Sequence, residues 1–110
     1  MRTRHRYVDR NRLLALIPDD LSLARADELV AQCVEPRPHG YGSDRAVLRR
    51  RGVSVWVVIA DLDATNGDLQ QAADDFDLQP DEVLAAVLYY RQVPDLIEAR
   101  ILLNDPSAAA

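Results

Sequence analysis

The sequence predicts a mainly α-helical protein that contains a helix-turn-helix. Apolar residues recur at helical spacing through much of the chain, and residues typical of helix caps stand before these stretches. Leu69–Val83 (LQQAADDFDLQPDEV) has the outline of two helices joined by a tight turn. A chain of 110 residues, 48% of them apolar, can build one small domain with a single core but no large catalytic cleft.

An arm and a helical extension are expected at the N-terminus, in residues 1–38. Residues 1–12 are too polar to pack and are expected to be mobile. Ser22 can cap the helix of the extension, which Pro36 and Pro38 stop. The apolar residues that follow helical spacing in this helix are Ala26, Leu29, Val30, Cys33 and Val34.

A loop rich in proline and glycine separates this extension from a core domain, residues 39–104. The loop is EPRPHGYGSD, residues 35–44, and its composition is typical of an irregular connection. The segment RAVLRRR that follows it, residues 45–51, is expected to be a short extended segment at a sheet edge. Arginine side chains at such an edge also discourage aggregation.

The apolar run VSVWVVIA, residues 53–60, fits either of two structures. Its β-branched residues favour a strand, and its lack of alternation favours full burial as a strand or as a helix. Asn66-Gly67 is a signal for a helix C-terminus. This signal favours a helix over Val55–Ala64, and Trp56 is expected to be buried near the centre of the core because the run is apolar on every side.

Three further helices are expected in the C-terminal half. Asp68 and Gln71 have the spacing of a capping box, so a short helix starts there. Pro80 suits the first turn of the next helix. Pro94 starts or kinks a last helix, and residues 105–110 form a frayed tail.

The second helix of the helix-turn-helix is poorly suited to reading DNA. If it entered the major groove, Gln79 could pair with adenine, but Asp81 would repel phosphate. Asp81 and Glu82 have a local role instead, because acids in the first turn complement the helix dipole. Leu84 and Leu88 form a second apolar stripe that exceeds what a three-helix core can bury. We therefore expect a homodimer with Leu84 and Leu88 in the contact.

The net charge of −5 is divided unequally along the chain. Residues 1–51 hold eleven arginines and seven acids, whereas residues 52–110 hold two arginines and eleven acids; there is no lysine. Such an asymmetry often marks separate binding surfaces. Arginines of the first half are candidates for contacts with phosphate or with an acidic partner; the alternative is a solvated edge and a disordered arm. The residues predicted to contact a protein partner are Arg49, Arg50 and Arg51. The residues predicted to contact DNA are Arg2, Arg4, Arg6 and Gln79.

The sequence gives little support for catalysis, and no cofactor is expected. His5 lies in the arm and His39 in the loop, with no nucleophile arrangement near either. A lone Cys33 excludes an internal disulfide, and no Cys or His cluster indicates a metal. A run of six aspartates has the residue type of a metal site, but it is better interpreted as acids on the exposed surfaces of helices. They are Asp61, Asp63, Asp68, Asp74, Asp75 and Asp77.

No membrane segment is expected, and the cytoplasm is the expected compartment. The longest apolar run, Val53–Ala60, is far too short to span a bilayer. The N-terminus carries several arginines but no apolar stretch long enough for a signal peptide.

Three motifs resemble the domain of unknown function family numbered 433. They are GVSVWVVIADL, then GDLQQAADDFDLQPDEVLAAVLYYR, then IEARI followed by Asn104, in the order and spacing that members of the family share. The resemblance covers about residues 52–104, roughly half of the chain. The chain departs from the family pattern before Tyr89, where it has Ala86-Val87-Leu88 in place of Ala-Leu.

The resemblance implies a homeodomain-like core of three to four helices, preceded by a short β segment. It also implies an antitoxin that neutralises a PIN-like ribonuclease toxin, because members of the family are often encoded beside such toxins. Functional residues of the family are poorly defined, so none is carried over to this chain.

The expected activity is therefore binding rather than catalysis. Either the N-terminal arm or Arg49, Arg50 and Arg51 would approach the acidic metal site of the toxin, since guanidinium groups pair with carboxylates through two hydrogen bonds. The protein would also be able to bind its own promoter. The alternatives are a DNA-binding transcriptional regulator without a toxin partner and, less well supported, a small enzyme.

Overall fold

Helix α5 (Pro80–Gln92) lies at the centre of a mainly helical fold, which confirms the class predicted from the sequence. The computed structural model describes residues 8–37, 40 and 42–104. The other helices in these residues are α1 (Arg10–Leu14), α2 (Leu23–Cys33), α3 (Val55–Ala64), α4 (Leu69–Phe76), α6 (Pro94–Leu103) and the short 3-10 helix η2 (Ser43–Arg45). None of them is long and apolar enough to cross a membrane.

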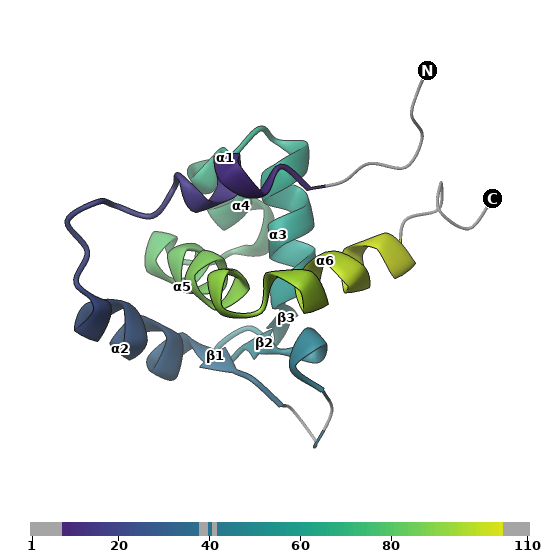
Figure 1. Cartoon of the computed structure of the whole chain (residues 1–110), viewed down its shortest axis with the longest axis horizontal. Helices are drawn as coiled ribbons and strands as arrows, with labels where there is room; N and C mark the ends of the chain where they lie inside the picture. The colour runs from purple at the N-terminus through teal and green to yellow at the C-terminus, as the bar shows by residue number, and fades with distance from the viewer. Residues whose placement is uncertain (1–7, 38–39, 41, 105–110) are drawn as a thin grey trace.

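Helix α5 is enclosed by its neighbours. In its sequence, apolar residues occur on every side, and a helix of this kind is stable only when all its sides are covered. Helices α1, α2, α3, α4 and α6 all pack against it. Figure 1 shows α2 on one side of α5 and α1 with α4 on the other. From Glu82 to Tyr90, every residue except Leu84 is buried.

The predicted helix boundaries are confirmed by their capping hydrogen bonds. The side chain of Ser22 accepts a hydrogen bond of 3.0 Å from the N–H of Arg25 at the start of α2. Asp68 does the same for the N–H of Gln71 at the start of α4, also at 3.0 Å. The ambiguous apolar run is a helix over Val55–Ala64, as Asn66-Gly67 indicated.

The short β segment is a three-stranded antiparallel sheet of two-residue strands. Its strands are β1 (Val34–Glu35), β2 (Val47–Leu48) and β3 (Val53–Ser54), in the order β1-β2-β3. The prediction of an edge position for the segment RAVLRRR is therefore wrong, because its strand β2 pairs on both sides. Val34 lies opposite Leu48, and Val47 lies opposite Ser54. The sheet thus joins the end of α2 to the start of α3.

The expectation of a mobile segment over residues 1–12 is wrong from Arg10 onwards, while residues 1–7 lie outside the described part of the chain. Arg10–Leu14 forms α1, whose Leu13 is fully buried in the core. Arg10 and Arg12, which looked too polar to pack, attach the helix through ion pairs. The guanidinium of Arg10 donates to Glu98 at 2.8 Å, and that of Arg12 donates to Asp63 at 3.0 Å.

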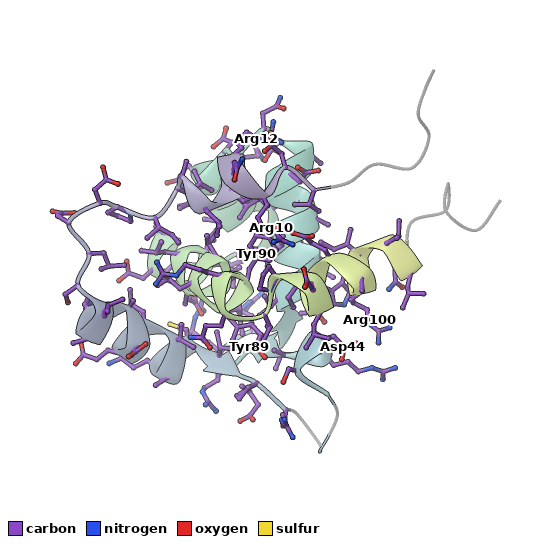
Figure 2. The ribbon with its side chains drawn as sticks, in the orientation of Figure 1. Arg10, Arg12, Asp44, Tyr89, Tyr90 and Arg100 are labelled. Atoms are coloured by element: carbon purple, nitrogen blue, oxygen red, sulfur yellow. The ribbon has the colours of Figure 1, made fainter. Side chains whose placement is uncertain are left out.

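Arg10 belongs to a network that joins three helices. Figure 2 shows its side chain beside Tyr90, and the hydroxyl of Tyr90 donates a short hydrogen bond to the same carboxylate of Glu98. The hydrogen bonds from Arg10 are the main reason why the pKa of Glu98 is lowered. Burial is the main reason why the pKa of Tyr90 is raised. At these pKa values Glu98 is ionised and Tyr90 is neutral, so that α1, α5 and α6 stay connected.

Helix α6 is also tied to the segment before the sheet. The guanidinium of Arg100 donates to Asp44 of η2 at 2.6 and 3.0 Å, and the two side chains meet in Figure 2. The hydroxyl of Tyr89 donates to the carbonyl oxygen of Ser43 at 3.0 Å. These contacts fix η2 against α5 and α6.

Two predicted side-chain positions are corrected by the packing. Leu88 is only 1% exposed because other residues of the same chain cover it, so it is not available for the predicted dimer contact. Leu84, by contrast, is half-buried. Trp56 is half-buried at the margin of the core. Residues at helical spacing take the core side of α3 instead, which turns Trp56 away from the centre. They are Val55, Val58, Ile59 and Leu62.

The different burial of two leucines on one helix generates a stability prediction. Leu88→Ala should lower the free energy of unfolding by about 2–5 kcal/mol, because it leaves a cavity among buried residues. Leu84→Ala is the matched control and should cost less than half as much. Urea unfolding followed by circular dichroism measures both. Equal losses, or dissociation of a dimer by Leu88→Ala without loss of stability, would contradict the enclosed position of Leu88.

Candidate functional site

An open groove lies where the end of α2, the turn after β2 and the first turn of α5 meet. Its volume is about 700 Å³, and its lining exposes more apolar than polar surface. The volume falls within the range of about 300–1,000 Å³ that is typical of binding pockets. The lining residues are Leu29, Gln32 and Cys33 from α2, Arg49 and Arg50 from the turn, and residues 79–82 from the start of α5.

The start of α5 is shaped by the turn that precedes it. Asp77 has a φ of 56°, in the left-handed region that the predicted turn requires of it. Pro80 occupies the first turn of the helix, where its missing N–H is not needed. The carboxylate of Glu82 accepts a hydrogen bond of 2.8 Å from the N–H of Gln79. The turn at Asp77 and the hydrogen bond between Glu82 and Gln79 thus fix the first turn of α5, which places Gln79 and Asp81 at the groove.

Glu82 is the one buried charged residue of the described chain, with 7% exposure, and Arg50 neutralises it. The guanidinium of Arg50 donates to the carboxylate at 2.7 Å and to the carbonyl oxygen of Asp77 at 3.0 Å. The hydrogen bonds from Arg50 are the main reason why the pKa of Glu82 lies below its usual value, and burial opposes this effect. Arg50 therefore fastens the turn after β2 to the start of α5.

The other two predicted partner-binding arginines also have acidic neighbours. Arg49 pairs with Glu35 at 2.8 Å, and the two side chains are 45% and 38% exposed. Arg51 pairs with Asp77 at 3.4 Å and does not line the groove. The predicted basic cluster is thus brought together by the structure, but each of its charges is matched within the chain.

Asp81 differs from these residues because its charge is not matched. It is exposed at the groove, and its carboxylate has no ion-pair or hydrogen-bond partner among the described residues. The thiol of Cys33 lies in the same groove. Its pKa is raised mainly by burial and further by the charges of Glu82 and Asp81. The neutral thiol adds to the apolar part of the lining.

The face of α5 that would enter a DNA groove is largely covered. Along α5 after Asp81, Ala85 and Leu88 are buried and Leu84 is half-buried. Gln79 is exposed, but it lies at the helix start beside Asp81. Arg2, Arg4 and Arg6, the other predicted DNA contacts, lie outside the described residues.

The acidic run contains one carboxylate pair but no cluster of metal ligands in the described residues. Asp61 of α3 has a buried Oδ2 atom without a hydrogen-bond partner. Burial, followed by the neighbouring Asp75 of α4, raises the pKa of Asp61 to about 6. Asp63 instead pairs with Arg12 at 3.0 Å. His5 and His39 lie outside the described residues.

The sequence did not indicate Leu29, Gln32 or Cys33 as site residues. They join the site because α2 packs on α5, and no local pattern reveals a contact over that separation. Asp81 did stand out, as an acid where a DNA-reading helix would carry a cation. Together these observations define a small, mainly helical protein with an open groove that has charged residues among its lining.

Comparisons with known proteins add no relative to this picture. No family model matches the chain, and neither a curated protein nor a solved structure does. The resemblance to family 433 therefore remains a prediction that rests on the motifs between Gly52 and Asn104.

The pair of Arg50 and Glu82 should give stability that depends on pH. A lowered pKa means that the folded state favours the ionised carboxylate, so this contribution is present above the ordinary pKa of 4.5 and lost on acidification. Arg50→Met should therefore destabilise the protein most at pH 7, and the difference from the wild type should shrink as pH falls below 4.5. Urea unfolding at several pH values tests this. Arg25→Met, which breaks the exposed pair with Glu28, is the control and should have little effect.

Asp61 should show the opposite pH dependence. Its pKa is raised from 3.8 to about 6, so the folded state favours the protonated form. The stability from this preference is present below pH 3.8 and lost as pH rises to about 6. Asp61→Asn should therefore raise the melting temperature at pH 7.5 and have a smaller effect at pH 4. Asp74→Asn, at an exposed acid of α4, is the control; equal effects of the two variants would contradict the role of burial.

Proposed function

We propose that the protein is an antitoxin-like, cytoplasmic binding protein that neutralises a PIN-like ribonuclease toxin. The observation that carries the proposal is the open groove beside Arg49 and Asp81, which has an apolar lining and a charged rim. Protein partners are typically held by apolar anchors within a polar rim. The motifs that resemble family 433 supply the identity of the partner.

The enclosed position of α5 supports protein binding over base reading. We interpret α4, the turn and α5 as a homeodomain-like helix-turn-helix that serves packing. A recognition helix needs a free face of several side chains for the major groove. Here the only exposed residues of α5 are Pro80, Asp81, Arg91 and Gln92. Promoter binding stays part of the proposal only through the arginines of residues 1–7.

We also propose that the protein forms a homodimer. Leu84 is the better candidate for the contact, because it stays partly exposed whereas Leu88 does not. Light scattering of Leu84→Asp against the wild type tests this part of the proposal.

The proposed function predicts inhibition of a specific nuclease. Mixing the protein with the PIN-like toxin encoded beside its gene should give a stable complex on size-exclusion chromatography. An equimolar amount should lower cleavage of a fluorescent RNA by at least about tenfold, because occupied toxin is inactive. The matched control is an unrelated acidic helical protein of similar size.

Two outcomes would contradict this proposal. One is full cleavage of RNA in the presence of excess protein. The other is tight binding to a promoter fragment that Gln79→Ala abolishes, measured by fluorescence anisotropy without any toxin. The second result would favour the transcriptional regulator without a toxin partner.

A further inference from the structure

We infer that the groove binds a segment of the protein partner that presents a lysine or arginine beside an apolar side chain. The inference rests on the proposed function, because the partner is the proposed toxin. It reverses the expectation that arginines of this chain would approach carboxylates of the toxin.

In the described part of the chain, one acidic charge at the groove is left without a partner, whereas the arginines there are paired. Arg50 is held by the buried Glu82, and Arg49 is matched by Glu35. The carboxylate of Asp81 is left without a partner among the described residues, at the rim of the same groove. A partner carboxylate would have to displace Glu35 from Arg49, whereas a partner cation would meet Asp81 without breaking a bond. Charge complementarity therefore favours a cation.

The lining of the groove also contains apolar surface. The neutral thiol of Cys33 and the ring of Pro80 supply apolar surface in the groove that contains Asp81, and Leu29 lines it at only 3% exposure. An ion pair at an exposed rim contributes little to affinity by itself. An apolar side chain inserted between α2 and α5 would exclude water there and strengthen the pair. The occupant thus needs both features, an apolar anchor and a neighbouring cation.

The chemistry of the proposed partner supplies such a segment. A ribonuclease has to attract a polyanion, so its substrate surface is rich in lysine and arginine. The groove presents the carboxylate of Asp81, which is unpaired among the described residues, and the whole protein carries a net charge of −5. Binding of a basic segment of the toxin in the groove would cover part of the surface that RNA needs.

The test reverses the charge of Asp81 and compares it with a matched site. Asp81→Lys should raise the Kd for the toxin at least about tenfold at low salt, and the difference should shrink at high salt. Asp20→Lys makes the same change of charge at an exposed loop position outside the groove and should stay within about twofold. Arg49→Ala should also have little effect. Because Asp81→Lys could weaken the start of α5, Asp81→Asn is measured as well and should reduce the affinity in the same direction.

The single cysteine gives a second readout of the same groove. Cys33 should react with iodoacetamide at pH 8.5 in the free protein and be protected in the complex, since the occupant would cover it. A complex that forms normally with Asp81→Lys, or that Arg49→Ala abolishes, would overturn the inference and leave the proposed function intact. No complex with the wild type would remove the proposed function and this inference together.

Discussion

The whole fold depends on covering one helix that has apolar residues on every side. Helix α5 buries nearly all its residues from Glu82 to Tyr90. The chain meets this demand by packing α2 from one side and α1, α3, α4 and α6 from the others. The ion pairs of Arg10 and Arg100 then fasten α1 to α6 and α6 to η2.

This enclosure leaves the two ends of α5 as the exposed parts of the helix. The first turn opens into the groove with Asp81, and the last turn presents Arg91 beside a smaller open pocket of about 310 Å³ near Leu14 and Pro18. Between these ends only Leu84 stays partly exposed. The motif that resembles a DNA reader in the sequence therefore places most of its second helix in the core. The charged residues at the N-terminal end of this helix lie at the groove.

Local signals in the sequence predicted the helices well and the long-range contacts poorly. Ser22, Asp68 and Pro94 mark helix ends through hydrogen bonds and backbone geometry within a few residues, so these boundaries could be predicted. Whether Leu88 is exposed depends on how many helices surround α5, which no local pattern reveals. The same holds for the groove, since Arg50 and Glu82 are 32 residues apart in the chain. The acid at Asp81 was visible in the sequence, but the groove around it was not.

The absence of lysine has a consequence for how the protein responds to its surroundings. Every cationic side chain in its ion pairs is a guanidinium, which keeps its proton far above any physiological pH. The pairs that hold α1 and η2 in place are therefore insensitive to alkali, and only their carboxylates can release them, in acid. Acetylation of lysine side chains cannot loosen these contacts either, because none of them contains a lysine.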